Sequence, residues 1–313
     1  MRPDDGVRLG GGHSRERALR PGRRAAPVPL RAVRPDHMRS ALTWVGLVFG
    51  AWLLWGLVLF LGHRRMIFPG RDALPLREGE TLHGAQLHRL VIHGAVVEAW
   101  WLPAAPGTPR PGPAVLFTHG NYELVDELVD SFGALQRAGA GVLLMEYPGY
   151  GRSTGVATEA SVTAAAVAAW DLLASMPGEV DSTRIIAFGR SVGGGAACAL
   201  SRQRPIAALV LSSAFTDIRA YARRYLLPGF LVRHPFDNEQ AVRAFRGPVL
   251  VQHGTRDTTV PFSHGERLAA VAADGRFLRY DCGHDDCPWD RMMADITGFL
   301  RRQGIILAPA GSP

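Results

Sequence analysis

One serine stands between an apolar run and a run of small residues, with a glycine two positions before it and another two positions after it. The apolar run covers residues 184–188, the pentapeptide is Gly189-Arg-Ser-Val-Gly193, and the small residues cover 194–200. A short apolar run is typical of a buried strand, and the small residues are compatible with a helix. In a sharp turn between the two, side chains at either glycine position would collide with neighbouring elements. The pattern therefore predicts a strand, a tight turn and a helix, with the hydroxyl of Ser191 exposed in the turn.

Two more polar residues follow apolar runs further along the chain. Residues 248–252 lead into His253-Gly-Thr-Arg-Asp257, and residues 276–280 lead into Asp281-Cys-Gly-His284. A serine hydroxyl becomes a good nucleophile when an imidazole removes its proton and an acid orients that imidazole. The order serine, acid, histidine, each just after a strand, is the order that belongs to this type of turn. We therefore predict a catalytic triad of Ser191, His284 and Asp257.

Other candidates for the acid and the base stand elsewhere in the sequence. Asp217 follows a neighbouring predicted strand and competes with Asp257 for the role of the acid. We prefer Asp257, because its loop follows the strand after which folds with this type of serine turn carry the acid. An isolated aspartate in a loop is usually a turn residue. His119, His253 and His264 lack the required place in the chain order and are expected to be structural or exposed. We expect His119 to brace the loop that follows it by hydrogen bonding.

Five short motifs lie between residues 87 and 302. They are Phe117-Thr-His-Gly-Asn121, Tyr147-Pro-Gly-Tyr-Gly-Arg-Ser153, Gly189-Arg-Ser-Val-Gly-Gly194, His253-Gly-Thr-Arg-Asp257 and Cys282-Gly-His284. On these motifs the chain resembles the α/β-hydrolase superfamily. With the apolar segment before them, it is most similar to the membrane-anchored serine hydrolases of the fungal bud-emergence type and their animal depalmitoylase-like relatives. The resemblance implies an enzyme that cleaves an ester or thioester of an acyl or lipid-like substrate through an acyl-enzyme.

An acyl-enzyme mechanism needs N–H donors for the oxyanion that forms during attack. The backbone N–H of Val192 is one candidate, because it directly follows the nucleophile at the start of the predicted helix. The second is expected in the loop after Thr118, at Asn121, as the resemblance to His-Gly-Asn loops implies. Tyr122 and Glu123 stand where small residues are commoner in the superfamily, which leaves the identity of the second donor open.

Short apolar runs alternate with helical stretches over most of the chain. An opening hairpin is expected at 87–93 and 96–102, followed by strands whose Val, Leu and Ile content is typical of parallel strands buried on both faces. The predicted class is α/β, an α/β-hydrolase fold with a mostly parallel central sheet flanked by helices. The predicted strands are 113–118, 141–146, 184–188, 206–211, 249–252 and 276–280, and the predicted helices are 125–137, 158–175, 194–202, 263–273 and 289–302.

The interval 214–245 interrupts this alternation. It carries aromatic and large apolar residues, among them Tyr225, Leu227, Leu231 and Phe236. In the superfamily that the chain resembles, this interval holds a small lid over the strand ends, and an apolar lid is consistent with an acyl substrate. Packing in the core would account for the same residues.

Residues 41–62 carry no charge. As a helix they would be about 33 Å long, enough to cross the roughly 30 Å hydrocarbon layer of a membrane. A signal peptide is the rival interpretation, but no small-residue cleavage site follows the segment. We therefore expect an uncleaved, single-pass transmembrane anchor. Because the arginines before it outnumber the basic residues directly after it, the positive-inside rule predicts that the catalytic domain lies on the translocated side, periplasmic or extracellular.

The basic residues are unevenly placed. Residues 1–39 hold ten arginines against four acids, which is +6 of the chain's net charge of +7. The rest of the chain is therefore nearly neutral, and no basic face suited to nucleic acid is expected on it. The chain has no lysine, which excludes Schiff-base chemistry. We expect a disordered Arg-rich tail at 1–40, an anchor at 41–62, a linker at 63–86, a hydrolase domain at 87–303 with a lid at about 214–245, and a C-terminal tail at 304–313. Alternatively, translation starts at Met38, and the residues before it are absent from the natural protein.

Three cysteines are present. Cys198, in the helix after the nucleophile, is expected to be a small buried residue. Cys282 and Cys287 bracket His284, and we expect free thiols there, with a disulfide or a metal site as the alternatives. Neither a phosphate-binding loop nor a His-Glu-x-x-His helix occurs, so no cofactor and no metal is expected.

Two rival functions stay open: an amide-cleaving peptidase that uses the same triad, and a noncatalytic binding module on a hydrolase fold.

Overall fold

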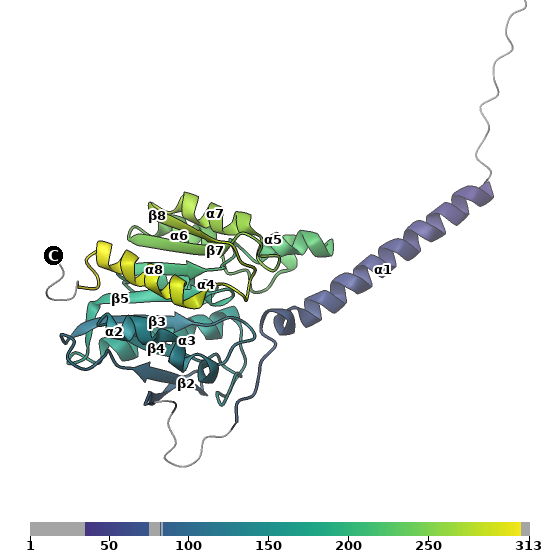
Figure 1. Ribbon diagram of the computed structural model, residues 1–313. Coiled ribbons are helices and arrows are strands. Elements are labelled where there is room, and N and C mark those ends of the chain that lie inside the picture. Colours follow the sequence, from purple (N-terminus) through teal and green to yellow (C-terminus); the bar gives the residue numbers. More distant parts are fainter. Residues whose placement is uncertain (1–34, 75–81, 83, 308–313) are drawn as a thin grey trace, which may run out of the picture. The chain divides into compact units, whose positions relative to one another are not determined.

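The computed structural model of the chain describes residues 35–74, 82 and 84–307 (Figure 1). The chain divides into two units, residues 1–52 and 53–313. Helix α1 covers Pro35–Ile67, and its part from His37 to Ile67 is long and apolar enough to cross a membrane. The predicted anchor 41–62 lies inside this helix. Residues 63–67 of the predicted linker are helical as well, and Arg64 and Arg65 in the last turn suit the negative end of the helix dipole.

Several predicted segments lie wholly or partly outside the described residues. They are residues 1–34 of the predicted tail, residues 75–81 and 83 of the predicted linker, and residues 308–313 at the C-terminal end. The prediction of a disordered N-terminal tail therefore stays a prediction.

The second unit is built on an eight-stranded sheet with the order β1-β2-β4-β3-β5-β6-β7-β8. Strand β2 is antiparallel to β1 and β4, and every other neighbouring pair is parallel. This confirms the predicted opening hairpin and the mostly parallel sheet. The strands are β1 Gln86–Ile92, β2 Ala95–Leu102, β3 Gly112–Thr118, β4 Gly141–Met145, β5 Val180–Arg190, β6 Ala208–Ser212, β7 Pro248–Gly254 and β8 Asp274–Tyr280.

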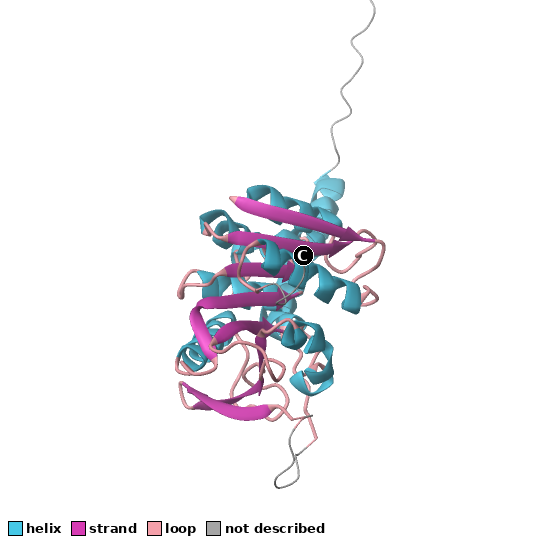
Figure 2. Ribbon diagram, turned by 60° about the vertical axis from the view of Figure 1, so that its left-hand side comes forward, coloured by secondary structure: helices cyan, strands magenta, loops and turns pink. Residues whose placement is uncertain are grey.

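Helices cover both faces of the sheet (Figures 1 and 2). Helix α3, Glu159–Ala174, packs on α4, Gly193–Ser201, which packs on α6, Asn238–Ala244, and α6 packs on α7, Phe262–Val271. Helices α2, Gly133–Arg137, and α8, Trp289–Arg302, pack on each other on the opposite face, where α2 contacts β4 and α8 contacts β7. The predicted capping start is present, because the Thr158 side chain accepts a hydrogen bond from the Ser161 backbone N–H.

One predicted helix is wrong. Residues 125–137 form two short 3-10 turns, Val125–Glu127 and Val129–Phe132, before the short helix α2. The backbone N–H of Val125 donates to the Glu146 carboxylate, and the Ser131 carbonyl accepts from the Trp289 indole. A continuous α-helix would pair the Ser131 carbonyl internally, whereas here the Trp289 indole takes it; the Val125 N–H, which has no internal acceptor at a helix start, is satisfied by Glu146.

Two apolar clusters fill the two sides of the sheet. In β3, Leu116 belongs to one cluster, whereas Val115 and Phe117 belong to the other. This alternation follows from the two-residue period of a strand. Because β5, β6, β7 and β8 are paired in parallel, the carboxyl ends of β5, β7 and β8 lie along one edge of the sheet.

Candidate active site

Ser191 occupies the sharp turn that the sequence predicts. It follows β5, precedes α4 and has a backbone φ of +52°, a left-handed conformation that is rare for serine. A Cβ at Gly189 would lie 2.4 Å from the Gly193 carbonyl oxygen, and a Cβ at Gly193 would lie 2.0 Å from the Thr118 carbonyl oxygen. Only glycine fits at these two positions, and this packing fixes the strained turn that carries the serine.

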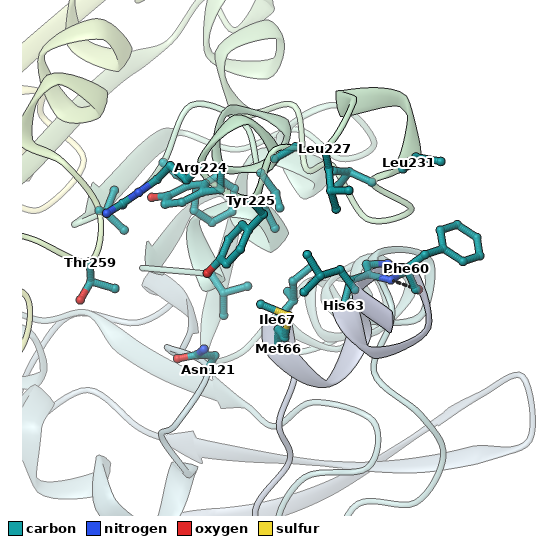
Figure 3. Close-up of a pocket in the computed structure, with 18 of the residues that line it drawn as sticks. Phe60, His63, Met66, Ile67, Asn121, Arg224, Tyr225, Leu227, Leu231 and Thr259 are labelled. Atoms are coloured by element: carbon teal, nitrogen blue, oxygen red, sulfur yellow. Dashed lines mark hydrogen bonds between the residues drawn. The ribbon is translucent and has the colours of Figure 1, made fainter. Parts of the chain in front are cut away.

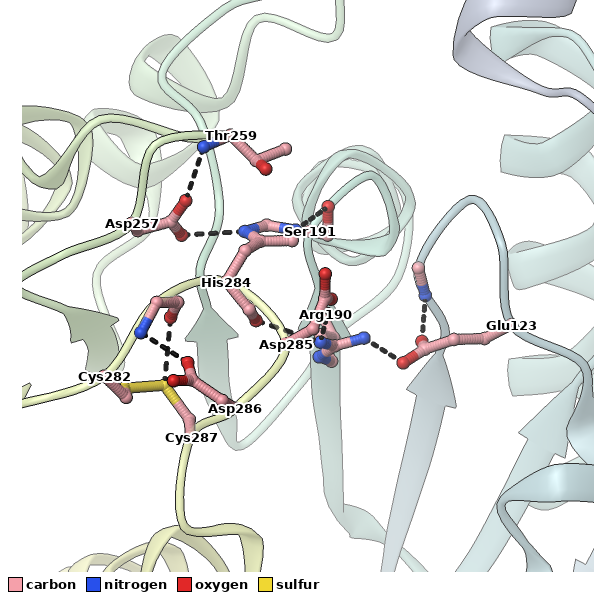
Figure 4. A network of polar contacts seen from close by, with 12 residues as sticks. Glu123, Arg190, Ser191, Asp257, Thr259, Cys282, His284, Asp285, Asp286 and Cys287 are labelled. Carbon is pink, nitrogen blue, oxygen red and sulfur yellow. Dashed lines mark hydrogen bonds and ion pairs between the residues drawn. A yellow bond between two sulfur atoms is a disulfide. The ribbon is translucent and has the colours of Figure 1, made fainter.

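The structure brings the three predicted triad residues together (Figure 4). The Nε2 atom of His284 lies 3.0 Å from the Ser191 Oγ, and its Nδ1 atom lies 2.7 Å from an Asp257 carboxylate oxygen. Ser191 and Asp257 are buried, and the His284 side chain is nearly so. This is the geometry in which an imidazole can take the serine proton while a carboxylate orients it.

The Asp257 carboxylate is held from several sides. Its Oδ1 accepts the backbone N–H groups of Thr259 and Val260 at 2.9 and 2.8 Å. Burial alone would raise the pKa of Asp257, but hydrogen bonds from His253, His284 and the Val260 N–H outweigh it and hold the pKa well below its usual range. Asp257 is therefore ionised at neutral pH and can stabilise an imidazolium at His284.

The competing acid lies apart from the histidine. The Asp217 carboxylate accepts the Arg219 backbone N–H at 2.6 Å and the Arg219 Nε at 2.7 Å. The three other histidines have structural contacts, as expected. The Nε2 of His253 lies 2.9 Å from the Val260 carbonyl oxygen and 3.4 Å from an Asp257 carboxylate oxygen, so its N–H is shared between the two. The Thr216 backbone N–H donates to the Nδ1 of His264 at 3.1 Å.

The predicted oxyanion donors face the same cavity as Ser191. Val192 and Asn121 both line it, and neither backbone N–H has an acceptor among the residues that the structure describes. Hydrogen bonds from neighbouring side chains support the loop that carries Asn121. His119 bonds Glu146 through Nε2 at 2.7 Å, as the predicted bracing role requires, and the hydroxyl of Tyr150 donates to the Asn121 carbonyl at 3.0 Å.

Sequence reasoning assigned no role to the residues that support this loop. The Tyr147 hydroxyl donates to the His119 carbonyl at 2.5 Å, and Glu146 also accepts the Val125 N–H. Both residues stand at the carboxyl end of β4, next to the strand that leads into the loop. The motif from Tyr147 to Ser153 was the signal in the sequence, although it did not indicate what the tyrosines contact.

Arg190, directly before the nucleophile, links two loops of the site (Figure 4). Its guanidinium pairs with Glu123, which in turn accepts the Gly120 backbone N–H at 2.5 Å. The same guanidinium donates to the His284 carbonyl at 3.1 Å and to the Asp285 carboxylate at 2.9 Å. One side chain thereby holds the candidate oxyanion loop and the histidine loop at fixed positions around Ser191.

Replacing Arg190 with glutamine should therefore slow the reaction. Misplacing either loop by a fraction of an ångström removes optimal alignment, and we expect kcat to fall about 10- to 100-fold with KM little changed. Arg204→Gln is the matched control, because Arg204 pairs with the exposed Asp171 on the protein surface and should leave kcat unchanged. Equal kinetics for the two variants would show that the Arg190 contacts do not position the site.

The histidine loop is closed by a disulfide between Cys282 and Cys287, so the prediction of free thiols there is wrong. The reason is a tight turn, in which the Gly283 N–H donates to the Asp286 carboxylate at 2.5 Å and the two cysteine Cα atoms lie 5.0 Å apart. That separation is within reach of a disulfide. Cys198 is free and buried, as predicted, and burial raises the pKa of its thiol.

An apolar cavity of about 580 Å³ opens above Ser191. Its walls come from the segment 215–232, which lies within the predicted lid, and from the last turns of α1 (Figure 3). Tyr225, Leu227 and Leu231 line the cavity, whereas Phe236 is buried against Gly195 in α4. The predicted lid interval therefore combines both interpretations, since its first part faces the cavity and its last part belongs to the core.

Comparison with known proteins shows what the chain is similar to. The model of the family "Serine aminopeptidase, S33" matches residues 109–234. An uncharacterized Mycobacterium tuberculosis protein, Rv2307c, is 33% identical over 264 residues, which are 80% of this chain and 92% of that protein. Lysophosphatidylserine lipase ABHD12 of Gallus gallus is 30% identical over 202 residues, 57% of this chain, and the match spans about half (52%) of that lipase.

Solved structures agree on the fold. The propionate-bound esterase Est2 of Thermogutta terrifontis superposes with a TM-score of 0.60 at 19% identity, covering 75% of this chain and 100% of that one. The narrower resemblance to the fungal bud-emergence type stays a prediction. The chain belongs to the α/β-hydrolase superfamily and is an esterase-like enzyme of that superfamily.

Proposed function

We propose that the protein is a serine hydrolase that cleaves a carboxylic ester or thioester through an acyl-enzyme, with Ser191, His284 and Asp257 as its triad. The observation that carries the proposal is the unbroken chain of contacts from the Ser191 Oγ through His284 to the Asp257 carboxylate. Its supports are the strained serine turn and the cavity directly above it.

Each step of the reaction has a group in place. The Ser191 Oγ passes its proton to the Nε2 of His284 and attacks the substrate carbonyl carbon, and the N–H groups of Val192 and Asn121 stabilise the resulting oxyanion. The C–O or C–S bond to the leaving group then breaks, and His284 donates its proton to that group. Water, activated by the same imidazole, attacks the acyl-enzyme and releases the carboxylic acid and the free Ser191.

The substrate class follows from the cavity. Among the described residues that line it there is no aspartate or glutamate, although an aminopeptidase would need an anion to bind the ammonium group of its substrate. The lining is largely aliphatic and aromatic, which suits an acyl chain. The relative named as a lysophosphatidylserine lipase points the same way. We therefore favour an acyl ester of lipid-like character over a peptide.

A panel of p-nitrophenyl esters tests this proposal. We expect the full-length protein in detergent micelles to hydrolyse the esters, with kcat/KM rising from acetate to medium and long chains because each added CH₂ enters an apolar cavity. Alanine p-nitroanilide, the matched amide, should be a poor substrate. A preference for the anilide would favour the peptidase, and no turnover of either class by folded protein would favour a noncatalytic binding module.

We also propose that α1 anchors the protein with its catalytic domain on the translocated side. The disulfide at the histidine loop supports this side, because disulfides persist in oxidising compartments. The protein should stay in the membrane fraction through an alkaline wash, since the insertion of an apolar helix does not depend on screenable charge.

Protease added to right-side-out vesicles should then digest the domain after α1, and Cys282 and Cys287 should resist alkylation until a reductant is added. Protection from protease together with two freely alkylated cysteines would place the domain in the cytoplasm.

A further inference from the structure

The last turns of α1 form one wall of the cavity that holds Ser191. Leu59, Phe60, His63, Met66 and Ile67 all line it. Figure 3 shows Met66 and Ile67 of α1, Asn121, and Tyr225 of the segment 215–232 around the same cavity. The helix that the sequence marks as an anchor is therefore also part of the proposed acyl-binding site.

Specific contacts hold this part of the helix against the lid segment 221–232. The Trp55 indole donates to the Tyr225 carbonyl at 3.0 Å, and a Cβ at Gly56 would lie 3.3 Å from a methyl group of Leu227. Trp55 and Gly56 belong to the charge-free stretch 41–62, and along the helix they lie about 9 Å or more before the end of that stretch at Gly62. If that stretch crosses a bilayer, the lid segment must reach below the membrane surface.

The outer side of the lid segment has the composition that such a position requires. Leu226 and Phe230, which do not line the cavity, are 73% and 84% exposed. Large apolar side chains with this exposure on a loop are typical of a surface that meets an apolar phase.

Arginines surround the same region. Arg65 follows the charge-free stretch, Arg223 and Arg224 belong to the lid segment, and Arg233 follows it directly; all four are exposed. Arg224 also lines the cavity, and the Arg233 guanidinium lies 5.6 Å from the centre of the Phe60 ring. Arginines placed there suit lipid phosphates at the membrane surface.

From these observations we infer that the substrate is a lipid ester resident in the bilayer, whose acyl chain enters laterally between α1 and the lid segment, with Leu226 and Phe230 immersed in the membrane. The inference rests on the proposed esterase function and adds the route and the source of the substrate. A lateral path keeps the acyl chain in apolar surroundings from the bilayer to Ser191, whereas an ester taken from water needs no membrane contact.

The test uses full-length protein reconstituted in vesicles of diether phosphatidylcholine, which contains no carboxylic ester, doped with a 1-oleoyl lysophospholipid. Oleate release is compared with hydrolysis of soluble p-nitrophenyl acetate by the same samples. For the double variant Leu226→Ser, Phe230→Ser we expect oleate release to fall about tenfold or more, because two membrane-immersed apolar side chains are lost, while acetate hydrolysis stays within about twofold. Leu307→Ser, at an exposed leucine at the other end of the domain sequence, is the matched control and should change neither.

A second variant tests the helix wall. Leu59→Trp narrows the cavity on its α1 side, and it should shift the preferred p-nitrophenyl ester toward shorter chains and lower the ratio of oleate release to acetate hydrolysis. If wild-type protein hydrolyses acetate but releases no oleate, or if both variants leave this ratio unchanged, the lateral route is wrong and the esterase proposal stands. If wild-type protein hydrolyses neither substrate, the proposed function itself fails.

Discussion

Ser191→Ala should lower kcat for p-nitrophenyl esters by on the order of 10⁶-fold, which is the loss that removal of the nucleophile causes in other triad enzymes. Without the Oγ that lies 3.0 Å from His284, no acyl-enzyme forms, and only binding and the oxyanion donors remain. The fold should persist, because alanine fits the same turn. Steady-state turnover and labelling by a fluorophosphonate probe measure the effect, and the probe should label wild-type protein alone.

The matched control is Ser201→Ala, at the end of α4. The Ser201 hydroxyl donates to the Cys198 carbonyl within the helix and has no contact with the triad, so turnover and labelling should remain at the wild-type level. Labelling that persists in Ser191→Ala would move the nucleophile to another residue.

The central strands β3, β4, β6 and β7 were predictable because they are apolar and almost wholly buried on both faces. Runs of Val, Leu and Ile located these strands, but the first residues of β5 were missed, since Asp181, Ser182 and Thr183 are polar. They continue the strand because Val180 pairs with Gly112 across an irregularity in the register. The predicted helix at 125–137 failed for a related reason, because the distant Trp289 indole takes the Ser131 carbonyl that the helix would pair internally. Local composition does not report such distant partners.

The triad order could be read from the sequence because each residue directly follows a strand, and parallel strands end at one edge of the sheet. The groups that position the triad could not. Arg190 contacts Glu123 on one side and Asp285 on the other, and Tyr150 reaches Asn121, so each contact joins segments far apart in the chain.

The double role of α1 was hidden for a different reason. A charge-free stretch of this length indicates a membrane span whatever its end contacts, and no periodicity in residues 59–67 distinguishes a cavity wall from a surface that faces lipid. Only the fold brings these residues to Ser191. The same holds for the disulfide, because the turn that brings Cys282 and Cys287 together depends on the Asp286 side chain.

Asp257→Asn should lower kcat about 10⁴-fold while the protein stays folded, as the corresponding change does in other triads. Asparagine has the shape of aspartate, and its carbonyl oxygen can still accept the Thr259 and Val260 N–H groups. It lacks the negative charge that stabilises the His284 imidazolium, and its NH₂ group favours the wrong tautomer. Circular dichroism establishes the fold, and steady-state kinetics with the best p-nitrophenyl ester measures the loss.

Acid unfolding gives the same variant a second readout. Because the pKa of Asp257 is depressed in the folded state, its carboxylate contributes stability at neutral pH, and this contribution is lost as the pH falls below the usual aspartate value toward the depressed one. Asparagine does not titrate, so the unfolding temperature of Asp257→Asn should depend less on pH in that range than the wild-type temperature does.

Asp217→Asn is the matched control for the loss of turnover. Asp217 pairs with Arg219 and does not contact His284, so the turnover of this variant should change no more than a few fold. A large loss in Asp217→Asn with near-normal turnover in Asp257→Asn would assign the acid to Asp217 instead.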